Sequence, residues 1–216
     1  MIQSDVLIIR MSDTKEKILD AAERLIGEHG YAATSLRHII AEAGVNLAAV
    51  HYHFGSKEAL LDAVVTRKVT PVNEARVAWL ERVEAEAGSG PVVVEKVLEA
   101  FLLPTAEVAN RNPGFVRLMG QMLAEGMMPR IVEKHFQATG RRFVSVLRRA
   151  VPDLPQEEML WRVHFMVGAM AHTMCRAPLF PQTAGDPSDM EPRMQRLVTF
   201  LSAGFRAPAT AGKEKK

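Results

Sequence analysis

The stretch TSLRHIIAEAGVNLAAVHYHFGSKEALL, residues 34–61, decides the fold. Its first apolar residues, from Leu36 to Ala43, recur at the spacing of one buried helical face. Gly44 follows at the position where many helices end in a left-handed residue. Thr34 or Ser35 precedes the first turn, and either hydroxyl is able to accept from the unpaired amides there. This part of the stretch therefore predicts a short helix that ends in a tight turn.

A second short helix is predicted from Leu47 to Phe54. Asn46 precedes it and is a favoured N-cap, because its side-chain oxygen accepts from the free amides of the first turn. Gly55 ends the helix, and Ser56 caps a third helix that begins at Lys57. Two short helices joined by a glycine-containing turn are typical of the helix-turn-helix unit, whose second helix enters the major groove of DNA.

The composition allows a sizeable hydrophobic core, but the net charge does not indicate nucleic-acid binding. The 216 residues are 48% hydrophobic and carry a net charge of only +2. A DNA-binding function must therefore rest on local geometry, with Arg37, Lys57 and helix N-termini on one face. The single cysteine, Cys175, excludes an internal disulfide framework and suits a reducing cytoplasm. No apolar run approaches a membrane span, so we expect a cytoplasmic protein without membrane contact.

The N-terminal segment MIQSDVLIIR, residues 1–10, differs in pattern from the helical sequence after it. It lacks the basic start and the cleavage site of a signal peptide. Met11 directly precedes Ser12 and Asp13, where a capped helix is able to begin. We therefore expect residues 1–11 to be a disordered arm or to lie before the true translation start.

The remainder predicts an all-α protein, because apolar residues follow helical spacing and no alternating strand pattern occurs. Pro71 should end or kink the helix that begins at Lys57. The predicted organisation is a helix-turn-helix domain over 12–56, a linking helix over 57–70, an effector-binding and dimerisation domain over 71–206, and a disordered tail over 207–216.

Histidine and cysteine pairs do not support a metal site. His51 and His53 are two apart on a helix and diverge from each other. His172 and Cys175 share a helical face, but two ligands are too few for a structural zinc. Helical spacings also bring together no catalytic constellation. The sequence therefore predicts no metal, no cofactor and no enzymatic activity.

The block YHFGSKEALL, residues 52–61, with TKEKILDAAERLIGEHGYAATSLRHIIAEAGV, residues 14–45, resembles the DNA-binding domain of the TetR family of bacterial repressors. One departure is His51, where family members often carry tyrosine. The resemblance implies a homodimer that reads a palindromic double-stranded operator. It also implies pairing through the helices expected at 156–176 and 190–205.

A second resemblance concerns the effector. LWRVHFMVGA (residues 160–169), FVRLMG (115–120) and VNLAAV (45–50) are similar to the fatty-acid-responsive PsrA-type repressors. That similarity implies release of DNA on binding a long-chain fatty acid or its thioester. Methionines are frequent in the same region, and unbranched thioethers suit an adaptable apolar pocket, although core filling is the simpler explanation for most of them.

These considerations predict two sets of site residues. The DNA-binding set is Thr34, Ser35, Arg37, Asn46, Leu47, Ala48, His51, Tyr52, His53 and Lys57. The ligand-binding set is Phe101, Arg117, Leu118, Gln121, Met122, Phe143, Met166 and Met170. Within it, Arg117 is expected either to meet the acidic end of an effector or to form a structural ion pair, for instance with Glu125.

Two other function classes compete with a ligand-responsive repressor. A helical-bundle enzyme or small-molecule carrier would require a reactive constellation or a closed pocket, and the spacings suggest no such constellation. An architectural DNA binder without an effector would not need the apolar helical region that makes up most of the chain.

Overall fold

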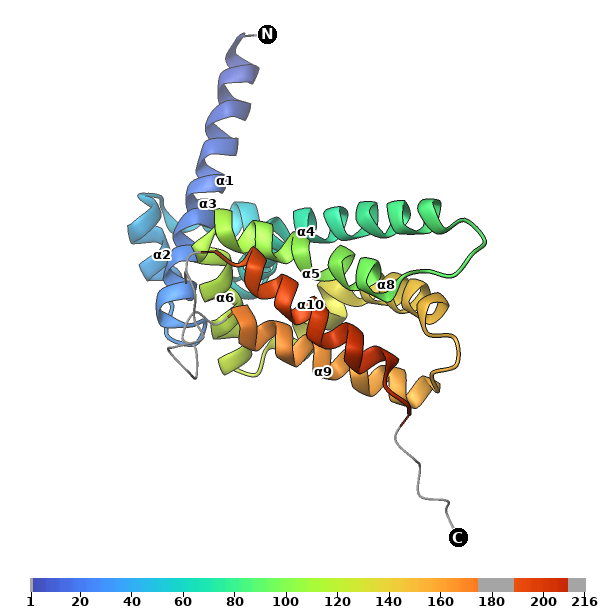
Figure 1. The fold of residues 1–216 in the computed structure, drawn as a ribbon. Helices are drawn as coiled ribbons and strands as arrows, with labels where there is room; N and C mark the ends of the chain where they lie inside the picture. The colour runs from blue at the N-terminus through green and yellow to red at the C-terminus, as the bar shows by residue number, and fades with distance from the viewer. Residues whose placement is uncertain (1, 175–188, 210–216) are drawn as a thin grey trace. The chain divides into compact units, whose positions relative to one another are not determined.

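The computed structural model describes the backbone of residues 2–174 and 189–209, and side chains from residue 13 onward (Figure 1). Within these residues every regular element is helical, which confirms the predicted all-α class. The elements are α1 (Ile2–His29), α2 (Leu36–Ala43), α3 (Leu47–Phe54), α4 (Lys57–Ala87), α5 (Val94–Arg111), α6 (Pro113–Ala124), α7 (Met128–Ile131), the π-helix η1 (Val132–Phe136), α8 (Gln137–Ala150), α9 (Gln156–Met174) and α10 (Glu191–Arg206). None of the described helices is both long and apolar enough to cross a membrane.

The chain divides into two compact units. Unit 1 comprises Met1–Pro71 and Pro113–His135, and unit 2 comprises Val72–Asn112 and Phe136–Lys216. The division at Pro71 lies where the predicted effector-binding domain begins. The segment 113–135 was expected in that domain, but it belongs to the same compact unit as the helix-turn-helix.

Unit 1 is built around α1. Its buried face contains Ile18 and Ile26, both fully inaccessible to solvent, and it packs against α2, α3 and α6. Ile39 of α2 and Val50 of α3 are equally inaccessible. Gly27 of α1 faces α6, where a Cβ would lie at an ordinary contact distance of 3.6 Å from the Arg117 Cβ. The first two helices of the predicted motif are thus held on one long helix.

Unit 2 is built around α5, which packs against α8, α9 and α10. Val97, Leu98 and Leu102 of α5 are fully inaccessible, as is Met194 of α10. The C-terminal end of α10 is fixed by Arg162 of α9, and the carbonyl oxygens that accept from its guanidinium are those of Gly204, Phe205, Ala207 and Pro208. These contacts satisfy carbonyls that a helix end leaves without partners.

Several expectations for the elements need correction. α1 begins at Ile2, so residues 2–11 are helical rather than an irregular arm. α4 continues through Pro71 to Ala87, so of the two expected effects of Pro71, an end or a kink, the end does not occur. Residues 210–216 of the predicted tail, and Cys175 of the His172–Cys175 pair, lie outside the described residues.

Candidate DNA-binding surface and effector site

The helix α3 has the features of a recognition helix. The Asn46 side-chain oxygen accepts from the Ala49 amide at 2.9 Å, as the sequence predicts. Val50 anchors the helix in the core, whereas the outward residues are open: Leu47 is 49% exposed and Tyr52 71% exposed. Gly55 ends the helix at a φ of +75°. Short length, firm capping and an exposed outer face together suit insertion into a groove.

The supporting helix α2 is fixed in the same way. The Ser35 hydroxyl oxygen accepts from the His38 amide at 3.2 Å. Gly44 ends the helix with φ and ψ of 65° and 35°, the left-handed conformation expected of a helix C-cap. Arg37 is exposed on this helix. The predicted residues Ser35, Arg37 and Asn46 therefore all belong to the surface or caps of the two-helix unit.

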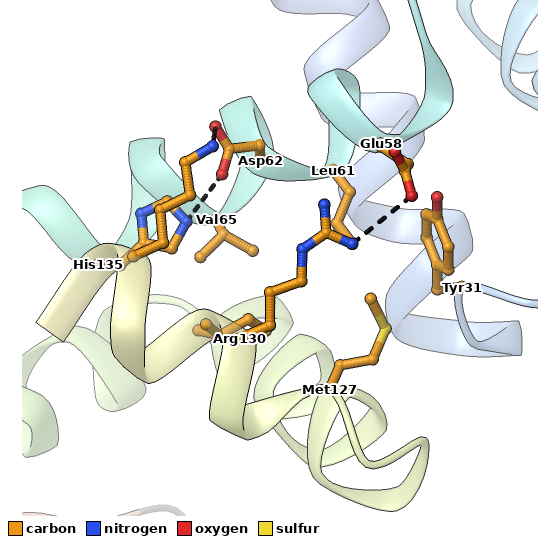
Figure 2. Close-up of a pocket in the computed structure, with 10 residues that line it drawn as sticks. Tyr31, Glu58, Leu61, Asp62, Val65, Met127, Arg130 and His135 are labelled. Carbon is orange, nitrogen blue, oxygen red and sulfur yellow. Dashed lines mark hydrogen bonds and ion pairs between the residues drawn. The ribbon is translucent and has the colours of Figure 1, made fainter.

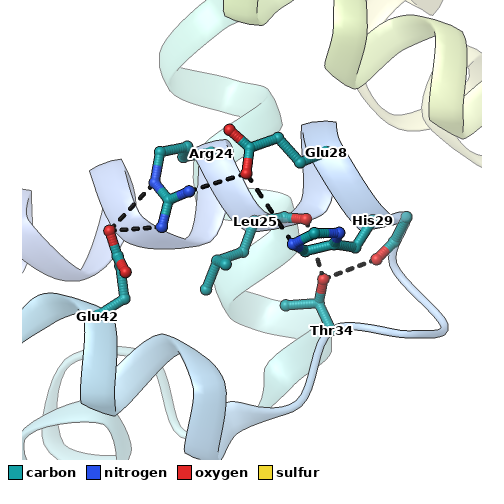
Figure 3. Close-up of polar contacts among 7 residues, drawn as sticks. Arg24, Leu25, Glu28, His29, Thr34 and Glu42 are labelled. Carbon is teal, nitrogen blue, oxygen red and sulfur yellow. Dashed lines mark hydrogen bonds and ion pairs between the residues drawn. The ribbon is translucent and has the colours of Figure 1, made fainter.

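Thr34 is not on that surface. It is only 1% exposed, and its hydroxyl donates to the carbonyl oxygens of Gly30 at 2.7 Å and Leu25 at 3.2 Å (Figure 3). A buried hydroxyl engaged in this way fixes the turn between α1 and α2. The expectation that the Thr34 side chain contacts DNA is thereby corrected.

A second polar cluster joins α1 to α2. The Arg24 guanidinium donates to Glu28 at 2.8 Å and, through Nε, to Glu42 at 3.1 Å (Figure 3). These side chains are partly exposed, so water and salt screen their charges. Its effect is to hold the orientation of the supporting helix.

Lys57 is engaged within the protein. Its ammonium donates to the Tyr31 carbonyl oxygen at 2.5 Å and lies 4.1 Å from the centre of the Tyr31 ring. Burial lowers the pKa of Lys57, while the charge of Glu125 opposes that shift. The start of α4 is thereby fixed to the turn after α1. Because an ammonium has three N–H donors, the hydrogen bond to the Tyr31 carbonyl leaves two of them for other acceptors.

A small cavity lies between the first turns of α4 and the segment 127–135 (Figure 2). His135 Nε2 is 2.9 Å from Asp62 Oδ1, and the Lys134 ammonium is 2.8 Å from the other Asp62 oxygen. The Arg130 guanidinium is 3.5 Å from the Glu58 carboxylate. The cavity volume is about 30 Å³, which accommodates a water or two but no effector.

The predicted ligand-binding residues belong to two different units. Arg117, Leu118, Gln121 and Met122 are residues of α6 in unit 1. Leu118 and Met122 are fully inaccessible, whereas Arg117 is exposed. Phe101, Phe143, Met166 and Met170 are residues of unit 2. There the Phe101 and Phe143 rings are in contact, with centres 4.5 Å apart.

The most unusual side chain of unit 2 is Arg76, which was not among the residues predicted from the sequence. It is 1% exposed, and its Nε donates to the Phe101 carbonyl oxygen at 2.8 Å. One Nη2 hydrogen bond goes to the Thr105 hydroxyl, also at 2.8 Å. Burial lowers the pKa of Arg76 to about 9. A signal existed, since Arg76 continues a buried stripe of α4 that includes Val69, Val72 and Leu80.

The outer faces of α9 and α10 carry large apolar side chains. The exposed fractions are 53% for Trp161, 61% for Phe165 and 72% for Phe200. The Trp161 and Phe165 rings are stacked at 5.8 Å. These are the helices expected to pair in a homodimer, although α9 is described only as far as Met174.

Two family models match the chain. Residues 18–64 match a model described as bacterial regulatory proteins of the tetR family, and residues 99–204 match the tetracyclin repressor-like C-terminal domain. Together they include the recognition helix and most of unit 2. Both matched families consist of transcriptional regulators rather than enzymes.

Curated relatives are similar over part of their length. The helix-turn-helix-type repressor Rv3405c of Mycobacterium tuberculosis is 35% identical over 107 residues, 47% of this chain and 55% of that protein. The regulator BetI of Rhizobium meliloti is 36% identical over 86 residues, 34% of this chain and 42% of that protein. YerO of Bacillus subtilis, described as an uncharacterised regulator, is 43% identical over 51 residues, 24% of this chain and 18% of that protein. The chain thus spans at most about half the length of these relatives.

Solved structures share the fold. The TetR-family regulator PfmR of Thermus thermophilus superposes with a TM-score of 0.59 at 22% identity, covering 86% of this chain and 97% of that one. A regulator from Shewanella gives a TM-score of 0.64 at 16% identity, covering 87% and 97%. With a capped helix-turn-helix and family matches in both parts of the sequence, the chain belongs to the TetR family of transcriptional regulators.

Proposed function

We propose that the protein is a homodimeric repressor that binds a palindromic operator and releases it when a small hydrophobic effector binds. The observation that carries the proposal is α3, which is capped by Asn46, anchored by Val50 and open along its outer face. As a regulator of bacterial transcription, the protein would act in the cytoplasm.

Different residues of the DNA-binding surface would have different roles. Leu47 and Ala48 are exposed and offer only apolar contacts, for instance to thymine methyl groups. Tyr52 and His51 are exposed beside them and supply polar groups. Arg37 on α2 is suited to a backbone phosphate, which positions the protein without reading sequence. His53 is half-buried and would contribute at the edge of the surface.

Dimerisation would cover the apolar faces of α9 and α10. Trp161, Phe165 and Phe200 are each more than half exposed in the single chain. Exposed large apolar groups in such density mark protein interaction sites. A pair of subunits would present two recognition helices about 34–36 Å apart, one helical turn of DNA. Sedimentation at micromolar concentration should show a dimer, and a stable monomer would contradict this part of the proposal.

The effector would be a long-chain fatty acid or its thioester, as the resemblance to PsrA-type repressors implies. The apolar residues Phe101, Phe143, Met166 and Met170, all in unit 2, support an apolar ligand. A ligand that favours a conformation unable to bind DNA must weaken DNA binding by the same factor by which DNA weakens ligand binding. If no small molecule releases the operator, the protein is an architectural DNA binder instead.

The operator test uses gel shifts on the DNA upstream of the protein's own gene. Arg37→Ala should weaken binding by on the order of tenfold and lower the salt slope by about one unit, the value for one lost phosphate contact. Arg141→Ala is the matched control, because Arg141 is an exposed arginine of α8 in unit 2. If both substitutions weaken operator binding equally, Arg37 does not contact DNA as proposed.

A variant of Lys57 tests whether its ammonium contacts a DNA phosphate or only fixes the start of α4. Lys57→Met removes both the hydrogen bond to the Tyr31 carbonyl and any phosphate contact. If the ammonium reaches DNA, the salt slope falls by about one unit across different operators. If the slope is unchanged while the melting temperature falls, Lys57 only fixes the start of α4.

A further inference from the structure

Arg76 of α4 is a buried cation without an anionic partner. Its guanidinium is held by the Phe101 carbonyl and the Thr105 hydroxyl, both at 2.8 Å. Its remaining hydrogen-bonding contacts are the Asn73 side-chain oxygen and the Met170 sulfur. No carboxylate is among its contacts with the described residues, and none is among the causes of its altered pKa. All four contacts are to neutral groups.

A lone buried charge is unfavourable. Arginine is almost never fully buried unless it is paired, because transfer of a charge out of water is costly. The pKa of Arg76, although lowered by burial to about 9, leaves the side chain charged at neutral pH. Neutral hydrogen-bond acceptors orient the guanidinium but supply no opposite charge. An anion at this place would therefore be strongly stabilised.

Each terminal nitrogen of Arg76 makes one weak contact, although Nη2 also donates to the Thr105 hydroxyl at 2.8 Å. Nη1 is 3.4 Å from the Asn73 oxygen, near the limit of a hydrogen bond, and Nη2 is 3.8 Å from the Met170 sulfur, a weak acceptor. These two nitrogens form the fork that binds a carboxylate in bidentate fashion. Met170 is half-buried and flexible, so its side chain is able to move aside for a stronger acceptor.

The surroundings of this guanidinium are apolar and aromatic. Its central carbon is 3.8 Å from the centre of the Phe101 ring and 5.6 Å from that of Phe136. Phe101 in turn contacts Phe143. The acidic group of a ligand at Arg76 would thus lie next to side chains suited to a hydrocarbon chain. Phe101, Phe143 and Met170 are also members of the ligand-binding set expected from the sequence.

We propose that Arg76 binds the carboxylate of an apolar acid, which replaces Asn73 and Met170 as the partner of its terminal nitrogens. This inference rests on the proposed function and narrows it to effectors with a free acid group. It also moves the expected anchor of the acid from Arg117, which is exposed on α6, to Arg76. A coenzyme A thioester carries its charges on a bulky nucleotide, which does not fit a fully buried guanidinium.

Calorimetric titration at pH 7.5 tests the proposal with the purified full chain. The probes are octanoate, decanoate, dodecanoate and oleate, each paired with the alcohol of the same length and with its coenzyme A thioester, below micelle-forming concentrations. For the wild type, the best acid should bind on the order of 10- to 100-fold more tightly than its alcohol, the value of one charge-assisted pair. No acid in the series exceeding its alcohol would overturn the proposal.

Three variants assign the preference to a residue. Arg76→Met should reduce the acid-to-alcohol ratio to about one, whereas Arg76→Lys, which keeps the charge, should retain part of it. Arg117→Met is the matched control and should leave the ratio unchanged. Loss of the preference in Arg117→Met, with Arg76→Met unaffected, would overturn the assignment. If Arg76→Met fails to fold by circular dichroism, the Arg76→Lys and wild-type ratios still decide the question.

Failure of this inference and failure of the proposed function give different results. Gel shifts without ligand measure operator binding alone. If the acid binds through Arg76 but the protein binds no operator, the repressor proposal fails and the acid site stands. If a neutral apolar compound releases the operator while no acid is preferred, the repressor proposal stands and the acid site fails.

Discussion

Two arginines of α4, one in each unit, have opposite surroundings. In unit 1, Arg67 contacts the carboxylates of Glu16, Asp20 and Glu23 at 2.7–2.9 Å. Burial alone would lower the pKa of Arg67, but the hydrogen bonds to these carboxylates raise it. In unit 2, Arg76 contacts none, and burial lowers its pKa to about 9.

The difference separates a side chain that maintains the fold from one that is available to a ligand. Arg67 has its counter-charges within the chain and joins α4 to α1. Arg76 is more deeply buried, yet its acceptors are neutral. Strongly perturbed pKa values of buried groups cluster at functional sites of proteins. Stability measurements on the two units should therefore respond differently to the loss of an arginine.

The largest loss of folding stability is expected at Arg162, an arginine of unit 2 that has a carboxylate partner, Glu158. Arg162→Met removes the guanidinium that donates to the Glu158 carboxylate and to the carbonyls at the end of α10. Loss of one partner of a buried pair costs about 3–5 kcal/mol. Urea unfolding should show a fall in this range. A fall below about 1 kcal/mol would mean that the carboxylate partner of Arg162 does not make it more stabilising than Arg76.

Arg67→Met should have a smaller effect of the same sign. Glu16 and Asp20 are more than half exposed and regain water, and Glu23 keeps its ion pair with Lys68 at 2.8 Å. We expect a loss of about 1–2 kcal/mol that shrinks in high salt. An unchanged loss in 1 M salt would show that the contribution comes from packing of the side-chain stem.

Arg76→Met, without ligand, should change stability in the opposite direction. The substitution removes a desolvated charge while leaving the Phe101 carbonyl and the Thr105 hydroxyl without a donor. Because replacement of buried charges by apolar groups is often neutral or stabilising, we expect a gain of up to about 1 kcal/mol. A loss above about 2 kcal/mol in urea unfolding would make Arg76 as structural as Arg67 and remove the contrast.

The smallest effect concerns a glycine of unit 1. Gly27→Ala adds a methyl group 3.6 Å from the Arg117 Cβ, an ordinary contact, and should gain about 0.5–1 kcal/mol from helix propensity. Gly30→Ala is the control, because Gly30 has a φ of +86° and its substitution should be destabilising. Gly27→Ala should also leave acid binding intact, whereas Arg76→Met should not. Reduced acid binding in Gly27→Ala would contradict this separation.

The helix-turn-helix was predictable because local chemistry determines it. Ser35 and Asn46 cap their helices as expected, and Gly44 and Gly55 end them. Each of these features depends on residues within one or two turns of the chain. The exposed and buried sides of α3 follow from the same short pattern.

The rest depended on contacts between distant segments. Pro71 signals a helix end locally, but tertiary packing continues α4 through it. The sequence suggests Thr34 as an exposed helix cap, but its side chain is buried and donates to the Gly30 and Leu25 carbonyls. Arg76 resembles a polar residue of a surface helix, and only its place in the buried stripe of α4 indicates otherwise. Helical spacing alone does not show that Arg67 has carboxylate partners and that Arg76 has none.

The buried hydroxyl of Thr34 affects how genetic results on this protein should be interpreted. A screen for cells that lose repression would recover Thr34 alleles together with alleles of the proposed DNA contact Arg37. The causes would differ, because a Thr34→Val chain loses the donor for two buried carbonyls and is cleared by cellular proteases as its unfolded fraction rises. Immunoblots of steady-state protein would show reduced abundance for Thr34 alleles and normal abundance for Arg37 alleles. Phenotype alone would classify both as DNA-binding residues.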